Sequence, residues 1–154
     1  MFELSILFPS ILNGLTTGAV YALIALGLTL IYGVLHIINF AHGSMLMLAM
    51  FGVYYLLTKL GVDPYLSLLI MVPAMYLLGY ALYRGLIGRM SQGKDENVLL
   101  ITLGLSIAIE NLALMFFKGD TRTISIPYMD TMVEMGPTLV SLPKLISFAA
   151  AMVL

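Results

Sequence analysis

Three polar side chains with the potential for chemistry, His36, Asn39 and His42, stand three residues apart in an otherwise apolar stretch. Residues at i and i+3 share a helix face, so they would form one stripe if the helix continued. They could bind a metal, relay protons in an ion-coupled carrier, or form hydrogen bonds that close off a broken helix. Two histidines six residues apart with no carboxylate nearby are a weak metal site, and we expect no metal and no cofactor. We favour the third role, in which Asn39 and His42 satisfy freed backbone groups while Gly43 lets the chain turn.

The stretch that holds these residues is too long for one membrane crossing. From Ile11 to Leu57, 47 residues contain no Lys, Arg, Asp or Glu. As helix they would measure roughly 70 Å, whereas the hydrocarbon core of a bilayer is about 30 Å thick. The stretch must therefore cross twice, with a break near Gly33, Asn39 and Gly43. Lipid cannot solvate backbone that leaves the helix at membrane depth, so the break must be buried in protein or line a watery cavity.

A polar break at membrane depth is where a substrate pathway is expected in a transporter. We therefore predict that the pathway is formed by five consecutive residues, with Glu110 as a further candidate. The five are Asn39, Phe40, Ala41, His42 and Gly43.

Composition places the chain in the lipid bilayer. It is 61% apolar and only 10% charged, with a mean hydropathy of +1.05, whereas soluble domains carry roughly 25% charged residues. The net charge of −1 and the scattered basic residues argue against nucleic acid as a partner. With no cysteine there is no disulfide framework and no thiolate metal site.

The apolar runs predict an all-α, polytopic integral membrane protein with about four complete transmembrane helices and the start of a fifth, in a single domain, 1–154. The first basic residue is Lys59, so the first run is not a signal peptide, which would begin with positive charge. Pro73 should kink or locally unwind the third span. The alternating segment Thr121 to Ile126 could be a short strand or an interfacial segment. The predicted parts are span 1 at 10–32, the broken motif and span 2 at 33–58, span 3 at 65–83, a loop at 84–97, span 4 at 98–117, a loop at 118–141 and the start of span 5 at 142–154.

The loop at 84–97 carries three of the seven basic residues and should therefore be cytoplasmic. Counting back three crossings places the N-terminus outside, and the loop at 118–141 is then also outside. The loop also contains a near match to a phosphate-binding P-loop from Gly88 to Lys94. The position that needs Ser or Thr is Asp95, and no strand precedes it, so we reject a nucleotide site. The chain is not expected to be an enzyme, and ATP hydrolysis would come from another chain.

Two further features have competing interpretations. Glu110 is the only carboxylate inside a predicted span, where a charge costs at least about 2.5 kcal/mol at the bilayer centre. It either lines the pathway and binds a substrate ammonium, or lies near the outer interface and hydrogen-bonds a neighbouring helix, which we favour. Small residues recur on one face of the first span and would let another helix approach closely, although glycine is common in membrane helices anyway. These small residues are Gly14, Gly18, Ala22 and Ala25. Methionines such as Met45 are interpreted as packing and not as metal ligands.

The residues from Gly14 to Gly43, GLTTGAVYALIALGLTLIYGVLHIINFAHG, carry a family resemblance. The segment resembles the opening of the LivH-type permease subunit of branched-chain amino-acid ABC importers, in which an NFAHG-like motif follows a GLxxGxxYALxALGLTLIYG-like helix. Weaker similarity continues through NVLLITLGLSIAIENLAL, where Glu110 replaces an expected Gln-like residue. Such subunits are about twice as long, and the run from Leu142 is unfinished at Leu154. We therefore expect an N-terminal fragment or a truncated product.

The resemblance implies an ATP-driven importer of branched-chain or related amino acids in the cytoplasmic (inner) membrane. It also implies the partners: a second homologous permease subunit, two ATP-binding subunits and an extracytoplasmic substrate-binding protein. The loop that docks the ATPase is expected in the missing half. The same family serves urea and short amides, which the sequence does not separate. An ion-coupled carrier or channel in which Glu110 and His42 titrate, and a non-transporting membrane anchor, are the alternatives of a different class.

Overall fold

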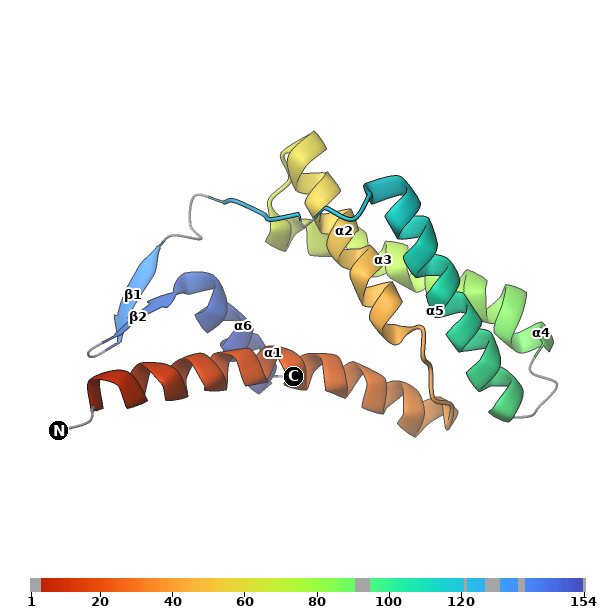
Figure 1. Cartoon of the computed structure of the whole chain (residues 1–154), viewed down its shortest axis with the longest axis horizontal. Coiled ribbons are helices and arrows are strands. Elements are labelled where there is room, and N and C mark those ends of the chain that lie inside the picture. The colour runs from red at the N-terminus through yellow and green to blue at the C-terminus, as the bar shows by residue number, and fades with distance from the viewer. Residues whose placement is uncertain (1–3, 91–94, 121, 127–130, 136–137, 154) are drawn as a thin grey trace. The chain divides into compact units, whose positions relative to one another are not determined.

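The computed structural model describes residues 4–90, 95–120, 122–126, 131–135 and 138–153. In chain order the elements are α1 (Leu4–Leu35), α2 (His42–Leu60), α3 (Pro64–Leu82), the π-helical turn η1 (Tyr83–Ile87), α4 (Gly88–Met90), α5 (Asp95–Phe117), β1 (Met132–Met135), β2 (Thr138–Ser141) and α6 (Leu142–Val153) (Figure 1). They form two compact units, one of Met1–Leu30 with Ile124–Leu154 and one of Ile31–Thr123.

The predicted all-α membrane fold is confirmed. Four helices among the described residues are long and apolar enough to span a bilayer: Leu7–Val34, His42–Leu60, Pro64–Ile87 and Glu96–Phe117. Many large apolar side chains on them are exposed in the isolated chain, for example Leu69 and Phe116. Such surface is suited to contact with lipid or with another membrane helix.

The connecting segments differ from the sequence prediction in three places. Much of the loop predicted at 84–97 is helical, since η1 and α4 extend α3 and α5 begins at Asp95. The α-helix runs through Pro73, so the predicted unwinding is not found there, and the π-helical turn lies ten residues further on. No strand forms over 122–126, the described part of the alternating segment; the strands lie at β1 and β2 instead.

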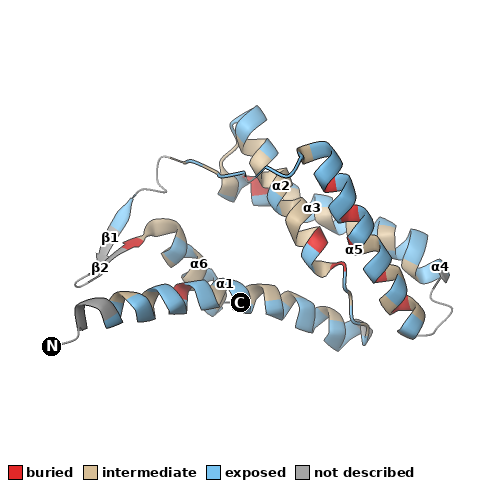
Figure 2. Cartoon of the chain, viewed as in Figure 1, coloured by how far each residue is buried: buried red, intermediate tan, exposed pale blue. Residues whose placement is uncertain are grey.

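Helix α5 packs against α2 through a stripe of buried residues (Figure 2). The stripe follows the helical repeat and consists of Val98, Thr102, Ser106, Ile109 and Ala113. Most of these side chains are small, which allows two membrane helices to approach closely. On α2, the buried Ser44 lies in the first turn, three residues after the buried Ala41. The start of α2 is therefore enclosed by protein.

The middle and second half of α2 pack against α3 and α5. A methyl group added at Gly52 would clash with the end of the Met71 side chain, so α2 and α3 approach closely there. The rings of Phe51 and Phe117 stack with centroids 4.1 Å apart, and Arg122 lies 5.9 Å from the ring centre of Tyr54. These contacts hold the part of α2 beyond its first two turns in place.

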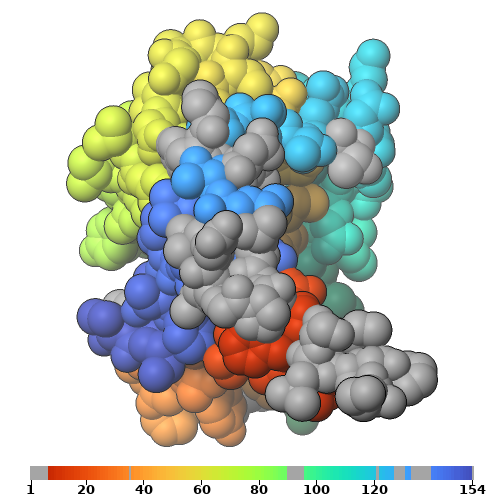
Figure 3. Space-filling view, turned by 90° about the vertical axis from the view of Figure 1, so that its left-hand side faces the viewer, coloured from red at the N-terminus to blue at the C-terminus, as the bar shows by residue number. Residues whose placement is uncertain are grey.

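In the other unit, β1 and β2 pair antiparallel, with Met132 opposite Ser141 and Met135 opposite Thr138. Strand β2 leads directly into α6, which lies beside the N-terminal part of α1 (Figure 3). Lys144 of α6 donates a 2.7 Å hydrogen bond from Nζ to Oδ1 of Asn13. The small-residue face of α1, formed by Gly14, Gly18, Ala22 and Ala25, is exposed, and its helix-packing role stays a prediction.

Candidate functional site

The predicted helix break lies between α1 and α2. Helix α1 ends at Leu35, and His36 follows in the left-handed region with a φ of 55° while its N–H still bonds to the carbonyl of Tyr32 at 2.8 Å. The left-handed conformation ends the helix. The prediction that Gly43 provides the turn is wrong. Gly43 lies in the first turn of α2, has no positive φ, and would accept a Cβ without meeting a neighbour.

Asn39 makes the hydrogen bonds expected at a helix break. Its side-chain Oδ1 accepts a 3.0 Å hydrogen bond from the N–H of Ala41, and its carbonyl accepts one of 3.2 Å from the N–H of His42. This arrangement is an Asx turn, in which a side chain takes the place of a backbone acceptor. The hydroxyl of Ser44 donates to the Ala41 carbonyl at 2.9 Å. The N–H groups of Ala41 and His42 thus find their acceptors within the break itself, which lowers the cost of placing this backbone in the membrane.

One hydrogen bond holds the break from a distant part of the chain. The N–H of Phe40 donates to Oγ1 of Thr102 on α5 at 3.3 Å. Thr102 is completely buried, and its own hydroxyl donates to the Leu99 carbonyl at 3.1 Å. Sequence reasoning missed this contact, because a threonine in an apolar helix ordinarily bonds to its own backbone. A pairing across 62 residues leaves no local signal.

Thr102 also gives the depth of the break. It stands seven residues after Asp95, the charged start of α5, which is about 10 Å along an α-helix. Phe117 at the other end of α5 is a further fifteen residues, or about 22 Å, away. If α5 spans the hydrocarbon core, the break lies about a third of the way in from the Asp95 end. It is therefore inside the apolar layer but off its centre.

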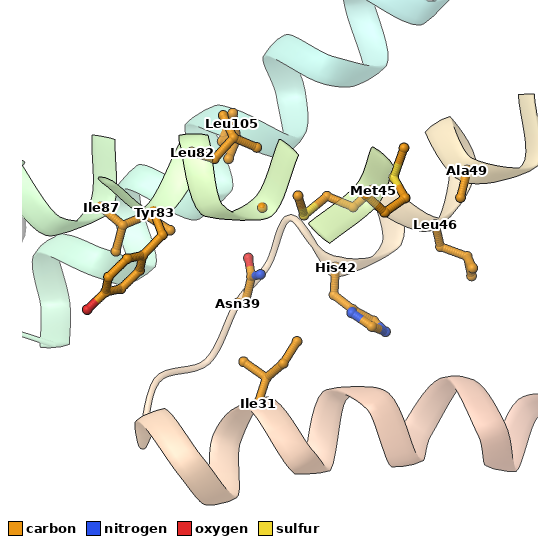
Figure 4. Close-up of a pocket in the computed structure, with 12 residues that line it drawn as sticks. Ile31, Asn39, His42, Met45, Leu46, Ala49, Leu82, Tyr83, Ile87 and Leu105 are labelled. Carbon is orange, nitrogen blue, oxygen red and sulfur yellow. The ribbon is translucent and has the colours of Figure 1, made fainter. Parts of the chain in front are cut away.

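A cavity of about 430 Å³ adjoins the break (Figure 4). Asn39 and His42 line it, and Ile31 of the last turns of α1 points toward the space beside them. The rest of the lining comes from α2, α3, η1 and α5: Met45, Leu46, Ala49, Met75, Gly79, Leu82, Tyr83, Ile87 and Leu105. The break and the π-helical turn thus border the same cavity. Turns of π-helix are frequent at functional sites.

His42 does not take the role predicted for its side chain. It satisfies no backbone group, and its Nε2 is buried without a hydrogen-bond partner among the described residues. His36 does not line the cavity, and its ring lies 6.3 Å from that of Tyr32. The single stripe of His36, Asn39 and His42 does not form, because the helix ends before it.

The other residues of the predicted pathway lie around the cavity without lining it. Ala41 is fully buried at the start of α2, whereas the side chain of Phe40 is 52% exposed. Gly43 is exposed in the first turn of α2. Of the five consecutive residues, Asn39 and His42 are the two whose side chains reach the cavity.

Glu110 lies apart from this cavity. It is exposed on α5, eight residues after Thr102, which is about 12 Å along the helix. Its Oε1 accepts a 3.0 Å hydrogen bond from Ser106 on the same helix, one turn earlier, and not from the neighbouring helix proposed as its partner. Together with Lys118 and Asp120 it lines a second cavity of about 390 Å³ near the end of α5.

Two further sequence features concern metal and nucleotide. Within the described parts of the chain, no group of three or more His, Asp or Glu residues could hold a metal ion. The rejected P-loop match includes residues 91–94, which lie outside the described residues.

The family model and the curated relatives that match this chain all describe permeases of branched-chain amino acid transport. Residues 10–154 match the family model of the permease component of branched-chain amino acid transport systems. The chain is 30% identical over 125 residues to the high-affinity branched-chain amino acid transport system permease protein BraD of Pseudomonas aeruginosa, covering 76% of this chain and 40% of the relative. It is 31% identical over 125 residues to the corresponding LivH proteins of Escherichia coli K12 and Salmonella typhimurium, covering 75% of this chain and 39% of each. No solved structure matches it.

The chain thus spans about two fifths of the length of these curated relatives. The family is one of transport permease components, not of enzymes. The four membrane-length helices among the described residues of this chain, together with these relatives, identify a multi-pass inner-membrane protein. Because the family model covers nearly the whole sequence, the chain belongs to the branched-chain amino acid transport permease family.

Proposed function

We propose that the chain is part of a permease subunit of an ATP-driven importer of branched-chain or related amino acids. The proposed partners are a second homologous permease subunit, two ATP-binding subunits and an extracytoplasmic substrate-binding protein. The permease itself supplies no nucleotide site. Family membership and the printed role of BraD and LivH in high-affinity branched-chain amino acid transport support this assignment.

The observation that carries the proposal is the cavity beside the helix break. Substrate sites of transporters commonly lie where helices are discontinuous within the membrane. Here Asn39 and His42 border a cavity at such a discontinuity, and Thr102 ties the break to α5. We propose that substrate passes this cavity, with Asn39 to Gly43 forming one wall of the path. Glu110 lies about 12 Å further along α5, and we assign it to the mouth of the path.

The proposed orientation places the N-terminus outside and the basic segment 84–97 in the cytoplasm. In that orientation α5 begins at the cytoplasmic face, so the break lies about a third of the way into the membrane from the cytoplasm. The substrate would reach the cavity after passing Glu110.

Substitution of the two cavity-lining polar residues tests the path. In the full-length subunit with its partners, His42→Leu or Asn39→Leu should reduce ATP-dependent amino-acid uptake to background while the complex still assembles. Ile38→Leu is the matched control, because Ile38 lies in the same break but does not line the cavity. Normal uptake by both cavity variants would refute the proposed path.

Inactivating the partner ATPase separates this proposal from the carrier alternative. Uptake should stop when the ATPase loses its catalytic residue. Uptake that persists would instead identify an ion-coupled carrier or channel.

Competition by urea or acetamide in the same assay would assign the transporter to the amide branch of the family.

A further inference from the structure

The cavity beside the break contains two polar side-chain groups that the fold leaves unused. Oδ1 of Asn39 is already bonded to the N–H of Ala41. The orientation of the amide is thereby fixed, and its NH₂ group has no partner among the described residues. Nε2 of His42 is buried and also without a partner in the described part of the chain. A buried polar atom such as Nε2 of His42 is rarely left in this state, which points to a missing ligand atom.

The remaining walls define the shape and polarity of such a ligand. They are aliphatic or thioether side chains for the most part, such as Ile31, Leu46 and Leu105, and none of the described residues that line the cavity is charged. A volume of about 430 Å³ is within the range of small-molecule sites. The ligand therefore has an apolar body and a single polar end.

The amide of Asn39 sets the polarity of that end, because an amide NH₂ can only donate hydrogen bonds. Nε2 of His42 acts as a second donor in the imidazole tautomer that carries its proton on Nε2. Helix α2 begins at His42, and its N-cap residue Ala41 provides no side-chain cap. The positive end of the helix dipole therefore also favours an acceptor or a negative charge there.

We propose that this cavity binds a small aliphatic solute through an sp² oxygen, of a carboxylate or of an amide, which accepts hydrogen bonds from the NH₂ of Asn39 and from Nε2 of His42. This inference deepens the proposed function, because it assigns a chemical role to two residues of the proposed path. The binding step itself requires neither ATP nor a partner chain.

The two histidines of the sequence provide a direct readout. The 154-residue chain with ¹⁵N-labelled imidazoles is placed in phosphatidylglycerol-containing nanodiscs, and His36→Gln assigns the signals. Three probes share one aliphatic body: isocaproate, isocaproamide and isohexylamine. Isocaproate, isocaproamide or both should shift the His42 Nε2 resonance saturably, whereas isohexylamine should not, and His36 should stay unchanged. A response to one oxygen compound alone identifies the carboxylate or the amide as the ligand group.

Two outcomes would overturn the inference. No shift with any probe is the result expected if a lipid acyl chain fills the cavity. An equal shift with all three probes would mean that the cavity recognises only the aliphatic body. Either result leaves the proposed function standing, because that function is tested by uptake and not by the imidazole signal.

A single substitution removes the donor while keeping the turn. In Asn39→Asp the carboxylate can still accept from the N–H of Ala41, but the NH₂ group is gone, so affinity for isocaproate should fall by at least about tenfold. Asn111→Asp is the matched control, because Asn111 lies on α5 outside the cavity and bonds to the Ile107 carbonyl at 2.7 Å. Unchanged affinity in Asn39→Asp would contradict the assignment. If that variant misfolds, His42→Leu is tested in its place by competition binding. Its affinity for isocaproate should fall by the same factor.

Discussion

The break between α1 and α2 and the turn between α2 and α3 both redirect the chain, but they are stabilised in different ways. The turn is stabilised by hydrogen bonds between neighbouring residues. Gly61 adopts a φ of 66°, and the N–H groups of Gly61 and Val62 bond back to the carbonyls of Leu57 and Leu56. Asp63 then accepts a 2.9 Å hydrogen bond from the N–H of Tyr65 and caps α3. All of these hydrogen bonds are formed within the turn and its flanking helices.

The break uses residues that are less suited to turning. Its left-handed position is a histidine, not a glycine, and its N–H groups are satisfied by Asn39 and by Thr102 of another helix. It also leaves Nε2 of His42 unpartnered in the described structure. The comparison indicates that the turn is optimised for stability, whereas the break accepts strain at the border of a cavity, as functional sites often do.

The largest effect is expected where the break depends on another helix. Thr102→Val preserves shape but removes the acceptor for the N–H of Phe40, which should lower the free energy of unfolding by about 1–3 kcal/mol. Denaturation by SDS in mixed micelles would measure it. Thr58→Val is the control, because Thr58 is exposed and bonds only to Tyr54 on its own helix; its effect should stay within about 0.5 kcal/mol. Equal stability of the two variants would show that the break does not need α5.

A smaller effect is expected in the self-contained turn. Gly61→Ala places a Cβ in the left-handed region and should lower the free energy of unfolding by about 1 kcal/mol. The His42 imidazole signal should be unaffected, because nothing in the turn reaches the cavity. Gly104→Ala provides the contrast: Gly104 is helical and has open space for a Cβ, so alanine should stabilise by up to about 1 kcal/mol. A stable Gly61→Ala variant would remove the proposed difference between the two connections.

These two connections also mark how far the sequence predicts the fold. The segment 61–64 contains Gly, Asp and Pro, whose preferences are local, and the uncharged stretch around Asn39 must fold back because of its length. The π-helical turn at Tyr83–Ile87 and the hairpin at 132–141 were not predicted. The π-turn carries no strong local signal, since it differs from an α-helix only in hydrogen-bond register.

For the site, the sequence predicted the polar residues but not their surroundings. The role of Asn39 follows from the tendency of asparagine to form an Asx turn. Gly43 was misassigned because glycine permits a positive φ without requiring one, and the chain turns earlier, at His36. Thr102 and the lining from α3, such as Met75, are positioned only by helix packing. Packing of this kind joins residues too far apart for any local pattern.

The smallest effect, and the sharpest test of the strain at the break, is expected at His36. A non-glycine residue in the left-handed region is unfavourable by roughly 1 kcal/mol, and the exposed His36 side chain does not line the cavity. His36→Gly should therefore stabilise the chain by a few tenths of a kcal/mol, the gain being reduced by the greater entropy of the unfolded glycine chain. His36→Val should destabilise it, because a β-branched residue is the least tolerant of a positive φ. Denaturation in mixed micelles measures the stability of the three chains, which should rise from His36→Val through the unchanged chain to His36→Gly. If glycine instead destabilised the chain and weakened isocaproate binding, His36 would belong to the site, and the break would be held by its side chain and not by its backbone.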